Sequence, residues 1–410
     1  MIDVVAQPGS DIETSAPPEP STRAVAAFYI ATAAVLYVIV AAANIFLPHS
    51  KDSDNAARIP GQSVLGGWLE FDSTWYTSIA AHGYYYIKGQ QSPVAFFPAY
   101  PLVVRVLTVV FRNEALAAVV LTVVCGLVVA LLYWRWLGDR LHGRQREVAF
   151  ALLLLYPYAW FLYGTAYADA FFLALVLGAF LAADRRNWLL AGVLGGIASA
   201  ARPVAPAVII GLVCVALDRQ GVLRVERRRG NGTRRVGVHV DTSKLQASIL
   251  WLALSVTGLA AWCAYLWHRF GDPIAFMTVQ AAPGWSQPAG PHTWFKIGFF
   301  DLVFGGHLFV LRLFPQAFVT VLFLCLAPAV ARRFGWGYGA YVLVVIGIPA
   351  LGTGDFQGMG RYALAAFPVF ALVGAWIVER GRAWTNALVV TSAACLAIGA
   401  LLFGTGAYLT

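Results

Sequence analysis

The feature that most constrains this chain is a series of apolar runs of about twenty residues, repeated along most of its length. Each run is long enough to cross a hydrocarbon core about 30 Å thick as an α-helix. Runs of this length must span as helices, because a helix satisfies all its own backbone hydrogen bonds in lipid. Only 12% of the residues are charged, against roughly 25% in a soluble domain. The chain is therefore expected to be an all-α integral membrane protein.

About eleven transmembrane helices are expected from the apolar pattern. They are predicted at residues 25–47, 115–134, 147–164, 169–183, 188–201, 203–217, 248–268, 303–331, 335–352, 362–378 and 384–407. The polar, Pro-rich residues 1–24 are expected to be a disordered cytosolic tail without a cleavable signal peptide, and residues 25–410 a single transmembrane domain. All five cysteines fall inside apolar runs, so neither a metal cluster nor an external disulfide is expected.

Basic residues between the runs predict the orientation. They occur at Arg135–Arg146, Arg185–Arg186, Arg219–Lys244, Arg332–Arg333 and Arg380–Arg382. All of these fall on the cytosolic side if the N-terminus is cytosolic. Residues 48–114 then form a large outer loop, and residues 218–247 a basic cytosolic loop that we expect to bind anionic lipid head groups. Since most of the net charge of +9 lies in these short loops, no nucleic-acid partner is expected.

This orientation makes two demands on the chain. The segment Phe96–Glu114 must not cross the membrane, and its central Arg105 favours a helix that lies at the interface. The segment Trp188–Leu217 must enter and return, as two short helices that meet at Arg202 and the prolines beside it. The alternative is a single kinked helix, which would invert the topology of everything downstream.

The stretch FDSTWYTSIAAHGYYY, Phe71–Tyr86, places one carboxylate among aromatic residues in the outer loop. If it is helical, Trp75 and Tyr76 share the face of Asp72. Aromatic rings beside one acid suit a sugar, because the rings stack on its C–H faces while the acid binds or deprotonates a hydroxyl. Alternatively, Asp72 is only the N-cap of an interfacial helix. His82 is a candidate phosphate contact or acid–base group, or an interfacial anchor.

Charged residues inside or beside apolar runs are functional candidates, because they are costly in a membrane. Asp169 begins one apolar helix, and Arg202 lies between two others, so Arg202 needs an anionic partner: Asp169 or a lipid phosphate. Arg361 lies at the outer end of a later helix, where it could also be snorkelling. His307 lies in an apolar run without a defined role. The sequence contains no P-loop, HExxH or nucleophile-elbow motif, which argues against a nucleotide-driven pump.

Several motifs together resemble a known family. FDSTWYTSIAAHGYYY followed by VAFFPAYPL resembles the signature W-D-x-x-x-Y/F-x-x-I-A-x-x-G-Y … F-F-P-x-Y/F-P-L of the PIG-V-type mannosyltransferases, in the GT-C superfamily of lipid-phosphate-sugar-dependent glycosyltransferases. YPYAWFLYGTAYADAFFLAL is similar to the family's P-x-x-x-F-x-x-x-x-Y-[ST]-E-[SA]-L-F stretch, and GGIASAARPVAP to its A-x-x-x-R-[PS] element. RFGDPIAFMTVQ and GRYALAAFP resemble later motifs of the bacterial members, so that the likeness covers most of residues 65–370. Phe71, Asp169 and Pro206 depart from the family's usual Trp, Glu and Gly.

The resemblance implies a GT-C-like bundle in which Asp72 deprotonates an acceptor hydroxyl as it attacks the anomeric carbon of a polyprenyl-phosphate sugar. Inversion of a β-linked mannose donor would give an α-mannoside. The expected contacts of the donor phosphate are Arg202, Arg361, His82 and Arg105. The expected substrate contacts are Trp75, Tyr76, Tyr100, Asp169 and His307. Because no metal ligands cluster in the sequence, no cofactor is expected, although a divalent metal stays open.

The expected partners are a polyprenyl-phosphate sugar donor, a glycolipid or lipid-linked glycan acceptor, and membrane lipids. The expected location is the plasma membrane, with the active site on the outer face. Nothing in the motifs identifies the sugar, so transfer of arabinofuranose or another sugar is one alternative. A lipid-linked saccharide flippase is a second alternative, and it would not need a base at Asp72. A non-catalytic membrane scaffold is a third, and it would tolerate changes at Asp72, Arg202 and Arg361.

Overall fold

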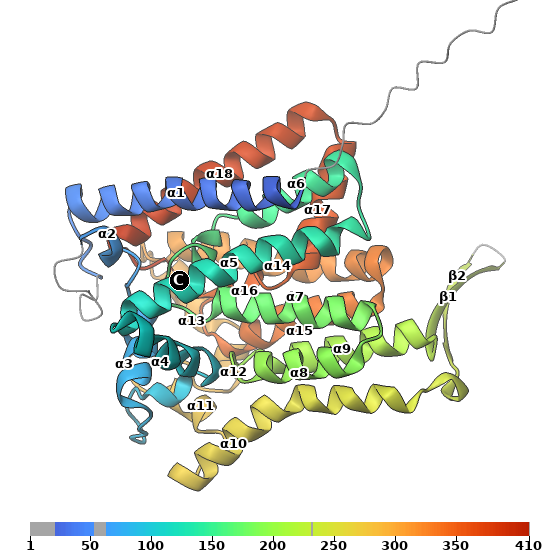
Figure 1. Cartoon of the computed structure of the whole chain (residues 1–410), viewed down its shortest axis with the longest axis horizontal. Helices are drawn as coiled ribbons and strands as arrows, with labels where there is room; N and C mark the ends of the chain where they lie inside the picture. Colours follow the sequence, from blue (N-terminus) through green and yellow to red (C-terminus); the bar gives the residue numbers. More distant parts are fainter. Residues whose placement is uncertain (1–20, 53–62, 231–232, 410) are drawn as a thin grey trace, which may run out of the picture.

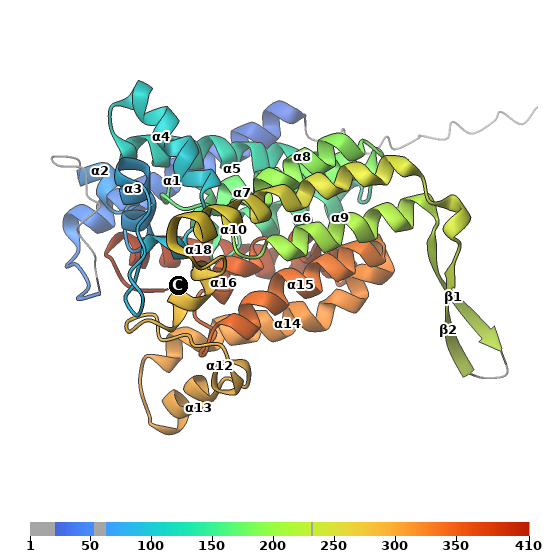
Figure 2. The ribbon, with the colours of Figure 1, turned by 90° about the horizontal axis from the view of Figure 1, so that it is seen from below.

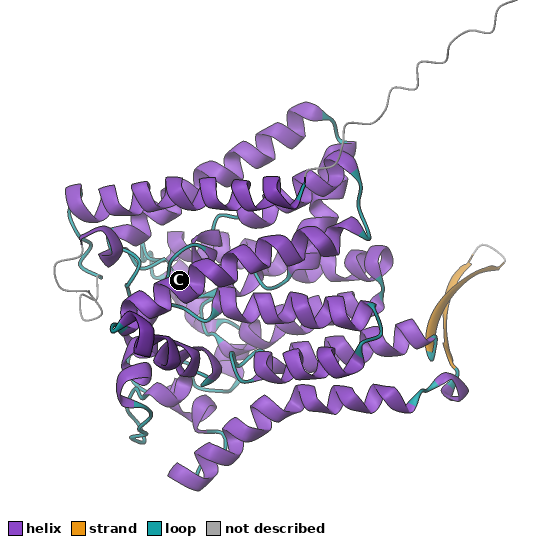
Figure 3. Ribbon diagram, in the orientation of Figure 1, coloured by secondary structure: helices purple, strands orange, loops and turns teal. Residues whose placement is uncertain are grey.

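The computed structural model describes residues 21–52, 63–230 and 233–409, and in this part the chain is a bundle of helices that run side by side (Figures 1 and 3). Five helical segments are long and apolar enough to cross a membrane. They are α1 (Thr22–Phe46), α5 (Glu114–Gly138), η5 with α10 (Ala247–Val256 and Thr257–Phe270), α14 (Val310–Phe334) and α18 (Arg382–Gly404). The predicted helical membrane fold is confirmed. The predicted tail, residues 1–24, lies mostly outside the described residues, and its last three residues belong to α1.

Shorter helices complete the bundle. They are α6 (Gly143–Leu154), α7 (Asp169–Asp184), α8 (Trp188–Ser199), α9 (Ala205–Gln220), α15 (Trp336–Gly352) and α17 (Phe367–Glu379). Each of the eleven predicted ranges therefore contains a described helix. The predicted span 147–164 is too long, because α6 ends at Leu154 and Pro157 follows, where a proline cannot donate a helical hydrogen bond. The chain continues there as a short turn, η3 (Ala159–Leu162).

The segment Trp188–Leu217 forms the predicted pair of short helices. Helix α8 ends at Ser199 and α9 begins at Ala205, so the break contains Arg202 and Pro203. The start of α8 and the end of α9 lie at the same end of the bundle, where Arg186 donates a hydrogen bond of 2.9 Å to the carbonyl of Arg219. The alternative of one kinked helix is therefore wrong.

Four of the arginines that the sequence assigned to one side gather at one end of the bundle. Arg140, Arg185, Arg219 and Arg333 line a common pocket. We call this end, to the right in Figure 1, the arginine-rich end. Asp72 lies at the opposite end, which we call the Asp72 end.

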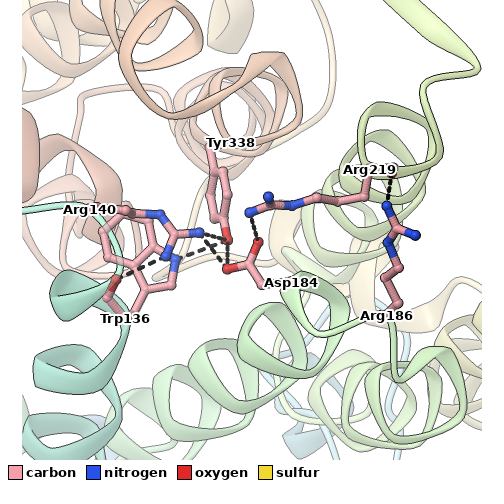
Figure 4. A network of polar contacts seen from close by, with 6 residues as sticks. All are labelled: Trp136, Arg140, Asp184, Arg186, Arg219 and Tyr338. Carbon is pink, nitrogen blue, oxygen red and sulfur yellow. Dashed lines mark hydrogen bonds and ion pairs between the residues drawn. The ribbon is translucent and has the colours of Figure 1, made fainter.

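A polar network ties four helices together at the arginine-rich end (Figure 4). The carboxylate of Asp184 accepts hydrogen bonds from Arg140, from Tyr338 at 2.7 Å and from Arg219 at 2.7 Å. Trp136 donates to the Tyr338 hydroxyl at 2.9 Å, and the guanidinium of Arg140 lies 4.1 Å from the centre of the Trp136 ring. The ends of α5, α7, α9 and α15 are thereby held in register, because a buried carboxylate is tolerated only with such partners.

Close packing of glycines positions α10 against α8. A Cβ on Gly196 of α8 would lie 2.6 Å from the carbonyl oxygen of Leu254, and a Cβ on Gly258 of α10 would lie 2.0 Å from the carbonyl oxygen of Gly196. Such close approach is possible only without side chains, and small residues serve the same purpose in other membrane helix pairs.

One departure from an all-helical fold occurs within the described residues. The basic segment that we predicted as a loop contains an antiparallel hairpin of β1 (Leu223–Gly230) and β2 (Thr233–Val240), followed by the turn η4 (Thr242–Lys244). The hairpin projects from the arginine-rich end (Figure 2). The intervening Asn231–Gly232 lies outside the described residues, but Asn-Gly between two such segments is the sequence signal of a hairpin.

The first loop, at the Asp72 end, holds the predicted short helices. It contains α2 (Ser63–Gly66), α3 (Asp72–His82), η2 (Pro93–Ala95) and α4 (Ala99–Phe111). Helix α4 has 13 residues and is therefore about 20 Å long, too short to cross a membrane. It leaves Val106, Val109 and Val110 exposed, as expected of a helix at an interface. The segment before α14 contains α11 (Ala275–Thr278), η6 (Val279–Ala281), α12 (Pro291–Trp294) and α13 (Ile297–Phe304), and α16 (Met359–Ala363) precedes α17.

Candidate active site

Helix α3 begins at Asp72, but this residue does not cap it. The cap position is Phe71, whose φ of 56° and ψ of −116° are unusual for a residue with a side chain. No side chain accepts a hydrogen bond at this cap. The capping hypothesis for Asp72 is therefore wrong. Its carboxylate instead accepts a hydrogen bond of 2.8 Å from Nη1 of Arg361.

Asp72 is the first member of a chain of four charged side chains. Nε of Arg361 lies 4.0 Å from the carboxylate of Asp169. Asp169 in turn pairs with Nη1 of Arg202, as the sequence suggested. We call Asp72, Arg361, Asp169 and Arg202 the charge chain; its two acids and two bases have no net formal charge.

The three side chains behind Asp72 are all more buried than Asp72 itself. The exposed fraction of the side chain is 28% for Asp72, 14% for Arg361, 5% for Arg202 and 3% for Asp169. Buried charges persist only where each has a partner of opposite sign. Asp169 and Arg202 provide this partner for each other. The accessible end of the charge chain is therefore Asp72, with Arg361 directly behind it.

Four separate elements bring the charge chain together. Asp72 comes from the start of α3, Arg361 from α16, and Asp169 from the first turn of α7, where the helix dipole favours a carboxylate. Arg202 comes from the break between α8 and α9. The break allows this arginine to turn inward at the Asp72 end, which an uninterrupted helix would not.

Aromatic rings surround the guanidinium groups. Arg361 lies 5.1 Å from the ring centre of Tyr167, and Arg202 lies 4.5 Å from that of Tyr362. The Tyr167 hydroxyl accepts from the backbone N–H of Asp72 at 3.0 Å and donates to the carbonyl of Glu70 at 3.2 Å. The rings supply cation–π contacts where water is excluded, and Tyr167 also fixes the backbone at the start of α3.

A shelf of three aromatic side chains lies one helical turn from Asp72. The rings of Trp75 and Phe96 stack with centroids 5.8 Å apart, and Trp285 lies 5.8 Å from Trp75 and 6.1 Å from Phe96. We call Trp75, Phe96 and Trp285 the aromatic shelf. Trp285 was not predicted, because nothing local in its sequence places the segment before α12 beside α3.

The other predicted aromatic residues lie behind this surface. Tyr76 is buried, with its ring 5.1 Å from that of Tyr100. Tyr100 has no exposed surface, and its hydroxyl lies 3.2 Å from the carbonyl oxygen of Ala118. Both therefore support α3 from beneath in this structure.

Three predicted residues are not brought to the charge chain. Arg105 donates to the carbonyls of Ala80 at 2.6 Å and Ile79 at 3.2 Å. These carbonyls lie towards the far end of α3, about 11–12 Å along the helix from Asp72. His82 is exposed at that same end, and His307 is exposed just before α14.

The segment after α18 also reaches the site, which the sequence did not indicate. We call residues 405–409 the strap. The ring of Tyr408 lies 4.7 Å from that of Phe71 at nearly a right angle, and Arg312 donates to the Tyr408 carbonyl at 3.1 Å. Burial raises the pKa of Tyr408 to about 12, so its hydroxyl stays protonated at neutral pH.

Gln316 of α14 links the strap to the charge chain. Its Nε2 donates to the carbonyl of Leu409 at 3.2 Å, and its Oε1 accepts from the N–H of Gly360 at 3.2 Å. Gly360 directly precedes Arg361. The strap therefore contacts Phe71, the residue before Asp72, directly. Through Gln316 it is also linked to Gly360, the residue before Arg361.

The described residues contain no group of three or more His, Cys, Asp or Glu side chains that could hold a metal ion. The carboxylates of the charge chain are paired with arginines instead.

The sequence matches no protein-family model and no curated protein. Two crystal structures of ArnT from Cupriavidus metallidurans are similar in fold. The structure bound to undecaprenyl phosphate has 16% identity over 93% of this chain and 76% of that chain, with a TM-score of 0.48. The apo structure has 14% identity over 94% of this chain and 77% of that chain, with a TM-score of 0.45. Likeness at this level establishes neither the family nor the activity of the chain, and the PIG-V resemblance stays a prediction.

Proposed function

We propose that this protein is an inverting GT-C-type glycosyltransferase that takes its sugar from a polyprenyl phosphate, with Asp72 as the general base. The observation that carries the proposal is the placement of Asp72. It is the most exposed member of the charge chain, and Trp75 of the aromatic shelf lies one helical turn further along α3. A partly exposed carboxylate next to stacked rings is suited to bind and deprotonate a sugar hydroxyl.

The proposed step forms one bond, breaks one bond and transfers one proton to Asp72. The acceptor hydroxyl oxygen forms a bond to the anomeric carbon of the donor while its proton passes to the Asp72 carboxylate. The bond between the anomeric carbon and the phosphate oxygen breaks, and the polyprenyl phosphate leaves with the electron pair. Attack from the face opposite the leaving group inverts the anomeric centre.

Arg361 is the cation best placed for the leaving phosphate. Its side chain is partly exposed beside Asp72, whereas its Nε is buried and lies 4.0 Å from the carboxylate of Asp169. A guanidinium can hold Asp72 with one nitrogen and donate to a phosphate oxygen with another. Arg202 is buried and already neutralised by Asp169. Its role is to keep Asp169 charged and in place behind Arg361.

The aromatic shelf supplies the surface for the sugar. Trp75, one helical turn from Asp72, and Trp285 approach each other from different segments of the chain. Stacked rings bind the apolar faces of a pyranose without reading its stereochemistry. Mannose as the sugar and a lipid-anchored glycan as the acceptor follow from the resemblance to the PIG-V-type enzymes.

The proposed location is the plasma membrane, with the N-terminus in the cytosol and Asp72 on the outer face. The arginine-rich end carries the arginines expected to remain in the cytosol. Asp72 lies at the other end of the same bundle. A donor with its phosphate in the outer leaflet would therefore meet Arg361 at the membrane surface.

The experiment is a transfer assay with the purified protein in lipid nanodiscs. Labelled polyprenyl-phosphate mannose or polyprenyl-phosphate arabinose is added with an extract of envelope glycolipids, and the labelled product is identified by mass spectrometry. We expect polyprenyl-phosphate mannose to give an α-linked product. Transfer from polyprenyl-phosphate arabinose should be slower by roughly tenfold or more, because a site that orients hydroxyls by hydrogen bonds discriminates between sugars. Absence of transfer from both donors would contradict the proposal.

A further inference from the structure

A second candidate site lies at the arginine-rich end, far from Asp72. A groove of about 880 Å³ opens between α1, α6 and α18, within the range of about 300–1,000 Å³ that is usual for small-molecule sites. Its walls are mostly apolar, and its polar side chains are gathered where the three helices begin. The groove is thus amphipathic, with one apolar part and one polar rim.

The apolar part is continuous with the surface that faces lipid. Phe28 of α1 and Val390 of α18 line the groove and are also exposed on the outside of the bundle. Both helices are long and apolar enough to span a membrane. An acyl chain could enter sideways from the bilayer between these two helices without crossing a polar barrier.

The polar rim favours an anion. Arg144 and Arg382 line it, and Arg144 donates to Asn386 at 3.1 Å. Within the described residues, no ion pair joins either arginine to a carboxylate. Glu147 is the acid among the lining residues, so the formal charge of the lining is +1.

The helix ends strengthen this preference. Helices α1, α6 and α18 all begin here, at Thr22, Gly143 and Arg382. The first turn of a helix presents unpaired N–H groups and a partial positive charge, which attract anions. In the neighbouring arginine pocket, by contrast, Arg140 and Arg219 both pair with Asp184, and α5, α7, α9 and α14 end there.

We propose that this groove binds one anionic glycerophospholipid from the leaflet at the arginine-rich end. Its phosphate lies between Arg144 and Arg382, and one acyl chain lies along Phe28 and Val389. The bound lipid joins the first and last spans of the described bundle. The site is separate from the proposed donor site, so its test does not depend on any transferase activity.

The test counts bound lipids by native mass spectrometry on delipidated protein titrated with phosphatidylglycerol. We expect the wild type to bind one more phosphatidylglycerol than R144Q/R382Q. The affinity of the double variant for that lipid should be roughly ten- to thirtyfold lower, because two cationic contacts are lost. R332Q is the matched control, since Arg332 is an exposed arginine in the last turn of α14 that does not line the groove. It should bind like the wild type.

Two further arms identify the ligand. Phosphatidylcholine should bind more weakly than phosphatidylglycerol, and glycerol 3-phosphate should not displace the lipid, because it lacks acyl chains. Equal binding by wild type and R144Q/R382Q, or displacement by glycerol 3-phosphate, would overturn the proposal. If R144Q/R382Q does not fold, V390W, which narrows the lipid-facing edge of the groove, must lose the same lipid.

Discussion

At the scale of single residues, the two aspartates of the charge chain differ in their surroundings and therefore in what they can do. Asp72 is partly exposed and keeps one arginine contact, so a substrate hydroxyl can reach it. Asp169 is sealed between two arginines and serves as their counter-ion. A side chain with almost no exposed surface cannot meet a substrate without a rearrangement, so Asp169 is better described as a positioning residue.

Breaking the buried pair should be costly. D169N leaves Arg202 charged and buried without its partner, which typically destabilises a protein by about 3–5 kcal/mol. We expect a clear fall in the thermal unfolding temperature of D169N, and a double variant D169N/R202M that is less destabilised than the sum of the two single variants. D139N, at an exposed position, is the control. Additive effects in the double variant would mean that Asp169 and Arg202 do not interact.

At the scale of elements, the strap explains how a residue with an unusual backbone can precede the proposed base. The ring of Tyr408 packs on Phe71, and Gln316 holds both the strap and the residue before Arg361. Backbone strain of this kind costs of order 1–3 kcal/mol and persists only where the surroundings enforce it. The strap, through Tyr408, and Phe403 of α18 both contact the Phe71 ring directly.

Removing the Tyr408 ring should therefore impair turnover more than substrate binding. We expect Y408A to lower kcat roughly tenfold or more with KM for the donor little changed, because misplacement by about 1 Å is enough for such a loss. Y408F keeps the ring and should retain most of the activity. W384A, an exposed aromatic change at the other end of the bundle, is the control. A loss of kcat in Y408F as large as that in Y408A would show that the hydroxyl, and not the ring, matters.

Lys296 links the segment before α14 to the end of α15. Its Nζ donates to the carbonyls of Ala350 and Thr353. Burial lowers the pKa of Lys296 from 10.5 to about 8. Between these two values the unfolded chain binds a proton that the folded protein does not. The free energy of unfolding should therefore rise as the pH increases through this window.

The measurement compares thermal unfolding of wild type and K296M from pH 7 to pH 10. The stability of the wild type relative to K296M should increase as the pH rises above about 8. K88M removes an exposed lysine and should show no such relative change. A relative stability that falls with pH would contradict the burial of Lys296.

At the scale of the whole molecule, the account depends on the two ends of the bundle facing opposite sides of the membrane. We expect a cysteine at Ser243, near the hairpin, to react with an impermeant maleimide only from the cytosolic side. A cysteine at Ala289, in the segment that carries Trp285, should react only from outside. Both positions are exposed, and both variants are made in a background without the five native cysteines. Labelling of both from the same side would contradict the proposed topology.

The large-scale organisation could be predicted because it follows from hydropathy and charge. The apolar runs located the helices, and the arginines required Trp188–Leu217 to turn back. The pairing of Asp169 with Arg202 was also foreseeable, since a buried guanidinium needs an anion.

The site itself was less predictable, because its contacts join distant parts of the chain. Asp72 and Arg361 are 289 residues apart, and Trp285 and Tyr408 come from segments without a recognisable motif. Whether α3 was capped by Asp72 or by the strained Phe71 depended on these contacts and not on local propensity. The β-hairpin was missed for a different reason: its basic residues were interpreted by charge alone, although Asn231–Gly232 signalled a turn.

The most direct test of the central claim is the single-turnover rate of sugar transfer by D72N in nanodiscs, with donor binding and thermal unfolding measured on the same preparation. D72N keeps the size of the side chain but cannot accept the proton. We predict a rate lower by roughly 10²–10⁴, with donor affinity within about threefold of the wild type, since that factor is less than 1 kcal/mol. Transfer by folded, donor-bound D72N at the wild-type rate would contradict the assignment of Asp72 as the base.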